Sequence, residues 1–253
     1  MANSSRVYQF DSAFDPNHTD SSFTVAMAPR DKPLAFLMEN MYIPFSFYAV
    51  NTYTHSFTLT DDSAVENTDV DYTVTIADGN YTASEYVTAV LAAMNASGTS
   101  WTYTMTYDTK TGKFTFGGAT RDFSITVNSQ GNHKLLGFAA SSTNTSSSQV
   151  LVSSYPADMT GPSYIDVKLD NISTNVYNNQ AINDPHFLDR VPVSNSAFGV
   201  VSLSKQIPMP VDISSRFANQ LQFSYWTNFG TPLLMNGHNV YGSLHVEMDV
   251  DPE

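Results

Sequence analysis

Met41-Tyr42-Ile43-Pro44-Phe45-Ser46-Phe47-Tyr48-Ala49-Val50-Asn51 is the stretch that decides the fold. It begins as a strand pattern, is interrupted by Pro44 and resumes with two aromatic residues. A proline cannot donate to a sheet ladder, so Pro44 is expected at a sheet edge or at the end of a strand. Ile43, Phe45 and Phe47 recur at every second position, which predicts one face that stays buried through the bend. The stretch therefore predicts a chain that turns a corner between two sheets.

Strand patterns rich in Val, Thr, Phe and Tyr recur along the whole chain. The expected strands are 23–27, 34–43, 45–50, 55–60, 72–76, 101–107, 114–116, 123–127, 163–169, 198–203, 221–226 and 240–250. In the last of them, apolar Leu244, Val246, Met248 and Val250 alternate with polar Ser243, His245, Glu247 and Asp249. Such alternation predicts a strand with one face on a core and the other on water or a neighbour. The fold class is all-β.

One segment, 82–95, is predicted to form a helix. Thr82 and Glu85 have the spacing of a capping box, and Tyr81 with Tyr86 has the spacing of a hydrophobic staple. A single apolar stripe follows, with Gly98 as a stop signal after it. The stripe consists of Val87, Val90, Leu91 and Met94. The helix is expected to lie on a sheet that includes the next hairpin.

That hairpin joins 101–107 to 113–116 through a turn in which Gly112 supplies a positive φ. Residues 70–138 are interpreted as a compact α+β unit, and the polar segment 139–149 as its exit. Strand patterns resume afterwards, so we expect one β-sandwich domain over 1–253 with a unit inserted at about 70–138. Its core is expected to come from residues before about 68 and after about 150. Residues 173–192 are expected to be an irregular surface excursion.

Composition excludes several classes of function. The 253 residues include 24 acidic and 11 basic ones, a net charge of −13, which disfavours binding to nucleic acid phosphates. There is no cysteine, so neither disulfides nor thiolate metal sites are expected. The first residues lack the apolar core of a signal peptide, and no apolar run has the length of a membrane span. Synthesis in the cytosol is expected.

No catalytic, cofactor-binding or metal-binding residues are predicted. There is no Gly-x-Ser-x-Gly elbow, and Thr111-Gly112-Lys113 lacks the first glycine and the helix of a phosphate loop. The six histidines are scattered without ligand spacing, and are interpreted as ordinary surface or loop residues; they are His18, His55, His133, His186, His238 and His245. No pair of carboxylates is marked out for glycoside hydrolysis.

Two binding hypotheses stay open beside these exclusions. The acidic run 61–71 offers oxygen ligands for Ca²⁺, although it lacks the order of an EF-hand loop, and a solvated loop is the alternative. The chain also has 14 Tyr, 16 Phe and 2 Trp. Exposed aromatic rings suit a sugar-binding platform, whereas rings in strand phase with aliphatic residues suit core packing, which is the default here.

Several segments, in this order, resemble single jelly-roll capsid proteins of polinton-like viruses, virophages and related large DNA viruses. They are Ile43-Pro44-Phe45-Ser46-Phe47-Tyr48, Gly79-Asn80-Tyr81-Thr82, Thr104-Met105-Thr106-Tyr107-Asp108, Thr111-Gly112-Lys113-Phe114-Thr115-Phe116, Leu135-Leu136-Gly137-Phe138, Gly161-Pro162 with Ser163-Tyr164-Ile165-Asp166-Val167-Lys168-Leu169, and Asn228-Phe229-Gly230-Thr231-Pro232-Leu233-Leu234-Met235-Asn236-Gly237. Together they cover most of the chain. Each alone is ordinary strand and turn chemistry, and it is their order that carries the resemblance.

The resemblance implies a single jelly-roll β-sandwich without catalytic residues, of the penton or minor-capsid type. A penton closes the five-fold vertices of an icosahedral shell, as a homopentamer beside the major capsid protein. This implies location in the virion, with synthesis in the host cytoplasm. The alternatives are a minor, cement-type capsid protein elsewhere in the shell and a lectin-like adhesin that binds glycans. A glycosidase on the same sandwich is a third possibility.

Overall fold

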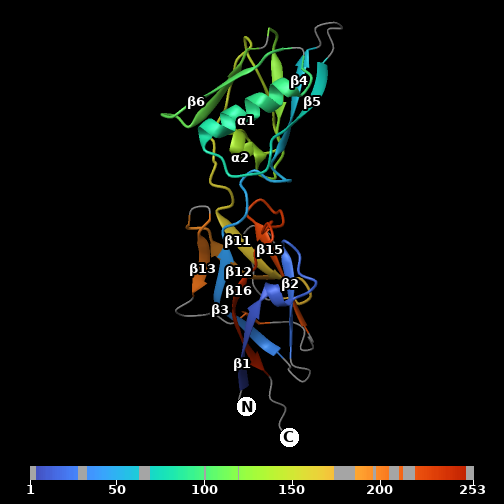
Figure 1. Ribbon diagram of the computed structural model, residues 1–253, viewed down its shortest axis with the longest axis vertical. Coiled ribbons are helices and arrows are strands. Elements are labelled where there is room, and N and C mark those ends of the chain that lie inside the picture. The colour runs from blue at the N-terminus through green and yellow to red at the C-terminus, as the bar shows by residue number, and fades with distance from the viewer. Residues whose placement is uncertain are drawn as a thin grey trace. The chain divides into compact units, whose positions relative to one another are not determined.

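The computed structural model describes residues 4–27, 33–62, 69–99, 101–118, 120–173, 186–195, 198–204, 211–212 and 220–248. The chain divides into two compact units. The first consists of Met1–Phe47 and Pro162–Glu253, and the second of Tyr48–Gly161 (Figure 1).

The first unit is built from antiparallel strands and one short 3₁₀ helix. Its elements are β1 (Ser4–Asp11), η1 (Ser12–Phe14), β2 (Ser22–Ala26), β3 (Pro33–Pro44), β11 (Tyr164–Leu169), β12 (Phe187–Pro192), β13 (Val200–Ser204), β14 (Val211–Asp212), β15 (Gln220–Thr227) and β16 (Tyr241–Met248). One sheet, called sheet A, has the order β1-β16-β3-β13, with β14 also paired to β3. The other, sheet B, has the order β12-β11-β15-β2.

This strand order defines a jelly roll. If β14 is set aside and the other strands are numbered as they follow along the chain, sheet A contains the first, eighth, third and sixth. Sheet B contains the fifth, fourth, seventh and second. All neighbours are antiparallel, and the arrangement is the double-sheet form of two Greek keys. The fold is therefore an all-β single jelly roll, and the second unit is inserted between its third and fourth strands, β3 and β11.

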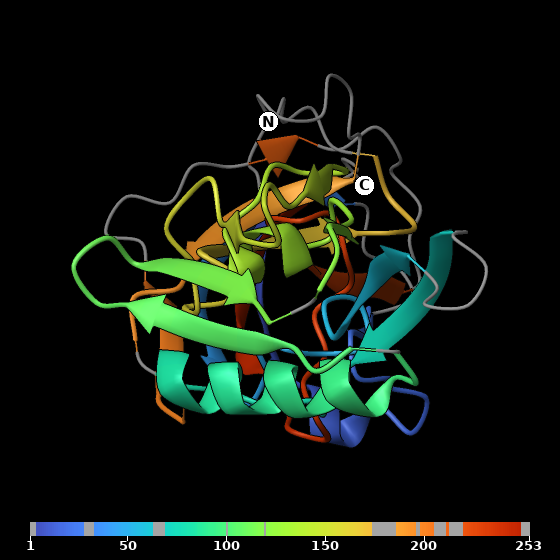
Figure 2. The same cartoon turned by 90° about the horizontal axis from the view of Figure 1, so that it is seen from above.

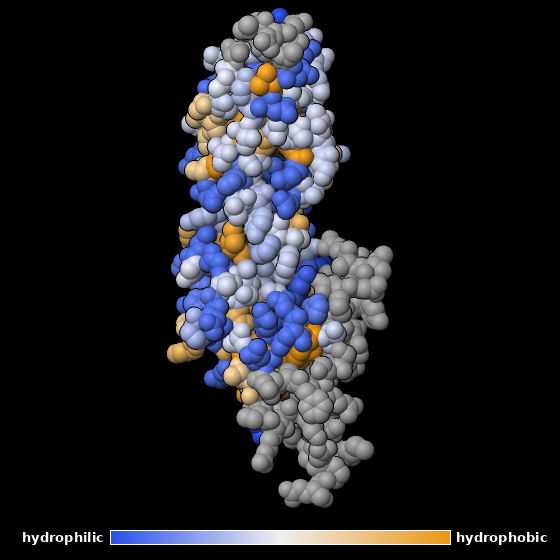
Figure 3. All heavy atoms as spheres, turned by 90° about the vertical axis from the view of Figure 1, so that its right-hand side faces the viewer, coloured by the Kyte–Doolittle hydropathy of each residue, from blue (hydrophilic) through white to orange (hydrophobic). Residues whose placement is uncertain are grey.

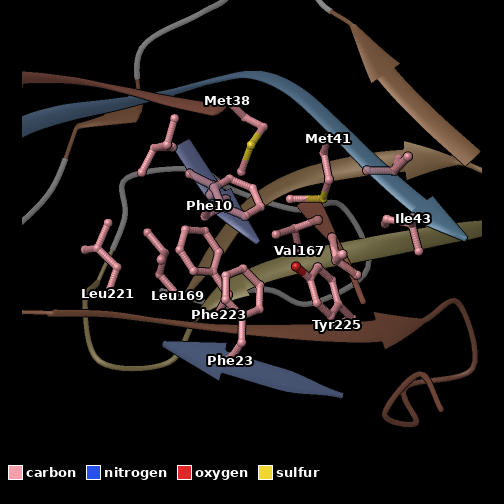
Figure 4. Packing of buried hydrophobic residues seen from close by; sticks show 14 of the residues in the cluster. Phe10, Phe23, Met38, Met41, Ile43, Val167, Leu169, Leu221, Phe223 and Tyr225 are labelled. Carbon is pink, nitrogen blue, oxygen red and sulfur yellow. The ribbon is translucent and has the colours of Figure 1, made fainter. Parts of the chain in front are cut away.

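The core of this unit lies between the two sheets, as Figure 4 shows. Phe10 of sheet A meets Phe23 and Phe223 of sheet B, with ring centroids 5.3 and 5.5 Å away. Phe23 and Phe223 stack at 4.9 Å. The expected alternation of the last strand is confirmed by buried Leu244, Val246 and Met248, whereas 249 and 250 lie outside the described residues.

In the stretch 41–51 the strand end at Pro44 and the buried face are confirmed, but the second strand is not. β3 ends at Pro44, and Ile43, Phe45 and Phe47 are all buried in the core, with Phe45 stacked on Phe47 at 4.1 Å. The expected strand 45–50 is wrong, because the backbone there pairs with loops: Phe45 N–H donates to the carbonyl of Gly199. The period of two in this segment arises because alternate side chains are buried, and the segment does not form a β-strand.

The second unit contains two small sheets and two helices. Its elements are β4 (Ser56–Asp62), β5 (Asp69–Thr75), α1 (Ala83–Ala96), β6 (Thr104–Asp108), β7 (Lys113–Gly117), β8 (Phe123–Thr126), α2 (Asn132–Leu136), β9 (Thr143–Thr145) and β10 (Leu151–Val152). The sheets have the orders β5-β4-β8-β9 and β10-β7-β6, and a separate hydrophobic core lies within the unit.

The predicted helix is confirmed as α1, and both bonds of its capping box form between Thr82 and Glu85. The buried line is Tyr86, Val90 and Met94, while Val87 and Leu91 are only partly buried at its flank. The apolar stripe is thus rotated slightly from the predicted one. α1 contacts β5 and β6, and Figure 2 shows it running alongside the β6–β7 hairpin.

Two glycines of this unit are required by geometry. Gly112 ends the hairpin turn with φ of +68°, as predicted. Gly137 follows α2 with φ of +74°, and a Cβ there would lie 2.3 Å from the carbonyl oxygen of Tyr155. A side chain at Gly137 would therefore force the two segments apart.

The boundaries of the inserted unit differ from the expected 70–138. β4 pairs with β5 and β8, so residues 56–62 belong to the second unit and not to the jelly roll. The polar segment 139–149 is not an exit, because β9 pairs with β8 and the chain continues into β10, which pairs with β7. Whether the unit folds by itself stays a prediction.

Several elements were not predicted. β1 and α2 were missed, and β12 lies inside the region 173–192 that was expected to be irregular. Residues 174–185 of that region lie outside the described residues.

Candidate assembly surfaces

On the outer face of sheet B, charged side chains pair with other side chains of the same sheet. Arg190 on β12 donates through Nε and one terminal nitrogen to the two carboxylate oxygens of Asp166 on β11, at 2.7 and 3.0 Å. The same guanidinium lies 3.8 Å from the centre of the Tyr164 ring. The hydrogen bonds that Arg190 donates to Asp166 raise the pKa of Arg190, so the guanidinium stays charged. This corner presents charges that already have partners.

The rest of that face is covered in the same way. The ammonium group of Lys168 lies 4.5 Å above the ring of Trp226. The Trp226 indole N–H donates to Ser224 Oγ at 2.9 Å, and Ser224 donates to Asp170 at 2.7 Å. A cation on the ring and a bonded N–H satisfy this tryptophan from within the chain. It does not form an open sugar-binding platform.

The outer face of sheet A is open by comparison. Tyr42 on β3 stacks on Tyr241 of β16 with centroids 5.0 Å apart. Tyr241 is 45% exposed, and the exposed fractions of Val7 on β1 and Val200 on β13 are 54% and 43%. Tyr241 pairs in register with Tyr42, and Val200 with Pro44 at the end of the same strand. Apolar side chains therefore extend across all four strands of this face.

Three polar side chains of this face, Glu39, Ser243 and His245, lie together. Glu39 Oε2 accepts from Ser243 Oγ at 3.2 Å, and Glu39 Oε1 lies 3.4 Å from Nδ1 of His245. The two outer faces differ in what they expose. Charged side chains on sheet B pair with one another, whereas sheet A exposes apolar side chains to water. Interface cores are depleted of charge and enriched in aromatic residues, so sheet A is the better candidate for a protein contact. On the face drawn in Figure 3, hydrophobic residues form small separate patches among hydrophilic ones.

The second unit has an apolar patch at its β10 edge. Val150, Val152 and Tyr155 are exposed there. The preceding turn places Ser148 and Gln149 at φ of +52° and +67°, a conformation that glycine and asparagine favour. Asp122 holds the turn, because its Oδ1 accepts from the Gln149 N–H at 2.8 Å.

The histidines do not form a site. His55 pairs with Asp78 at 2.8 Å, and His18 and His186 bond to backbone carbonyls. His133 is buried, and desolvation lowers its pKa, so it is neutral near pH 7. His238 and His245 also belong to the first unit, and Nδ1 of His245 lies 3.4 Å from Oε1 of Glu39. Among the described residues, no group of three or more His, Cys, Asp or Glu side chains is arranged to hold a metal ion.

The acidic run 61–71 is only partly described, since 63–68 lie outside the described residues. Asp61 is buried in the second unit, where its Oδ2 accepts from the Tyr103 hydroxyl at 3.0 Å. Burial and this carboxylate raise the pKa of Tyr103, which keeps the phenol as a donor. Asp71 accepts from Thr60 on the neighbouring strand at 2.6 Å. Both carboxylates are tied to strands, and the calcium hypothesis stays a prediction.

Two phenylalanines depart from the core-packing default. Phe14, at the end of η1, is 86% exposed, and Phe198, in a connection, is 84% exposed. Phe14 lies outside every expected strand, whereas Phe198 falls in the expected strand 198–203 and has no signal that separates it from the buried phenylalanines. Within the described part of the chain, no helix is long and apolar enough to cross a membrane.

No family model matches the chain, and no curated protein matches it in sequence. Two solved structures are similar over nearly its whole length. The selenomethionine-labelled mavirus penton protein is 10% identical, with 98% of this chain and 100% of that chain covered and a TM-score of 0.48. A chain of the Sputnik virophage, solved by cryo-EM, is 11% identical, with 96% and 97% covered and a TM-score of 0.44. The jelly-roll assignment rests on strand order and register.

Proposed function

We propose that this chain is a structural protein of an icosahedral viral capsid, and that it closes the five-fold vertices as a homopentamer. The observation that carries the proposal is the jelly-roll strand order of the first unit. Of the segments that resemble capsid proteins, Ser163–Leu169 contains β11, and Ile43–Tyr48 contains the junction with the inserted unit. The chain acts by assembly and not by catalysis.

The outer face of sheet A supplies the lateral contact in this proposal. A ring needs one patch that meets a different patch on the next copy, so that the rotation closes. The open apolar side chains of sheet A provide one of these two patches, since burying them stabilises the contact by about 25 cal/mol per Å² of apolar area removed from water. The major capsid protein is the other neighbour. With a net charge of −13, the chain is not expected to bind the genome.

Analytical ultracentrifugation and native mass spectrometry of the purified protein test the proposal. The expected mass is that of five copies. Tyr241→Lys places a charge in the sheet A contact and should release monomers. Gln222→Lys is the matched control, because Gln222 is exposed on the outer face of sheet B and the pentamer should survive there. A monomer or trimer for the unmodified chain at high concentration argues against the five-fold role, and equal effects of the two variants argue against sheet A.

A further inference from the structure

The most exposed large apolar side chain of the described chain, Phe14, stands beside a groove. The groove has a volume of about 590 Å³ and lies between β1, η1, β2 and the start of β15. Sites for small ligands commonly have volumes of about 300–1,000 Å³. A second groove, of about 500 Å³, adjoins the first and shares Phe14 and the end of β1 with it. The rest of its lining comes from β3 and β16 and includes Tyr241 on the sheet A face.

The first groove is held in shape by two carboxylates. Asp15 is buried, and its two oxygens accept from the N–H groups of Asn17 and Thr24, at 2.9 and 2.7 Å. This ties the loop after η1 to strand β2. Asp11 caps η1, with Oδ1 accepting from the N–H of Ala13 at 2.9 Å. The ring of Phe14 is therefore presented by a short turn that is fixed at both ends.

The remaining polar lining consists of neutral amides with spare hydrogen-bonding capacity. Gln9, Asn17 and Gln220 are exposed at the groove, and their side chains make no hydrogen bond to the described residues. Each amide offers both a donor and an acceptor. Asp11 adds one carboxylate oxygen, Oδ2, beyond the one used for its cap. None of the described residues that line the groove is a lysine, an arginine or a histidine.

From this combination we infer that the groove beside Phe14 binds neutral carbohydrate. Sugar hydroxyls are donors and acceptors at once, which matches amides and a carboxylate oxygen. The C–H face of a pyranose is apolar and can pack on an exposed aromatic ring such as that of Phe14. Polar side chains around the ring can then bind the sugar hydroxyls. Among the described lining residues the charged side chains are Asp11 and Asp15, both acidic, which disfavours phosphate, sulfate and sialic acid. The inferred activity is additional to assembly, and its groove adjoins the sheet A face, because Asp11 in its lining pairs in register with Tyr241.

Saturation-transfer difference NMR on the intact protein tests the inference. The probes are lactose, maltotriose, cellotriose and chitotriose, with 3′-sialyllactose as the anionic counterpart of lactose. At least one neutral probe should show transfer at concentrations up to about 10 mM, the range of weak single-site binding. Phe14→Ala should weaken that binding about tenfold or more, which is about 1.4 kcal/mol or more.

Phe198→Ala is the matched control, because it removes an equally exposed phenylalanine of the same unit and should leave binding unchanged. Both variants should keep the melting temperature of the parent, since neither ring is in the core. The inference is overturned if no neutral probe binds, if 3′-sialyllactose binds better than lactose, or if Phe14→Ala leaves binding intact. It is also overturned if Phe14→Ala changes only the oligomeric mass, which would make Phe14 a protein contact.

Discussion

Replacement of Phe223 tests the packing of the jelly roll at its centre. The ring is fully buried and stacks on Phe23 of the same sheet and on Phe10 of the opposite sheet. Each such ring pair contributes about 0.5–1.5 kcal/mol beyond the buried area. Phe223→Leu keeps most of the apolar volume and loses both pairs, so the free energy of unfolding should fall by about 1–3 kcal/mol. Phe223→Ala also leaves a cavity and should cost about 3–5 kcal/mol.

The two tryptophans make the assay specific to one unit. Trp226 lies in the jelly roll and Trp101 in the inserted unit, and the chain has no other tryptophan. Urea unfolding followed by fluorescence in a Trp101→Phe background reports the jelly roll alone. Phe14→Leu, at an exposed ring, is the control and should change stability by less than about 0.5 kcal/mol. A loss below that value for Phe223→Leu would refute the proposed contact between the sheets.

The remaining predictions concern the inserted unit. Met94→Ala removes a fully buried side chain of α1 and should destabilise the unit by about 2–5 kcal/mol in the Trp101 signal, whereas Ser84→Ala should do little; equal effects would mean that the buried face is assigned wrongly. Ser148→Asn with Gln149→Gly suits the left-handed turn and should raise the melting temperature, and a lower value would contradict the strain argument. Replacing 48–161 by a short Gly/Ser linker should leave a cooperatively unfolding β protein; loss of cooperative unfolding would count against independent folding of the two units.

Sequence patterns predicted those elements whose signal is local. The alternation at Leu244, Val246 and Met248 needs only one strand to be visible, and the capping box of α1 spans four residues. The bend at Pro44 was predicted because proline removes a donor wherever it stands. β1 was missed although it contains Val7, Tyr8 and Phe10, and its pairing with β16, at the other end of the chain, is not visible in a local pattern.

The limits of the inserted unit depended on pairing that no local pattern contains. The composition of β4 is compatible with a sheet of the jelly roll or with a sheet of the inserted unit. Its pairing with β5 and β8 places it in the inserted unit. The surfaces were less predictable still. Phe198 and Phe223 both lie in expected strands, and only the folded backbone makes one exposed and the other buried. The ion pair between Arg190 and Asp166 on sheet B likewise joins two strands that are separated in sequence, so no local pattern predicts it.

A particle reconstruction by cryo-EM tests the central claim most directly. Particles that contain this chain should show the jelly roll at the five-fold vertices, with five copies around each axis and the outer face of sheet A in contact with a neighbouring copy. Density for the chain spread over the facets, or purified particles without the chain, would contradict the vertex assignment.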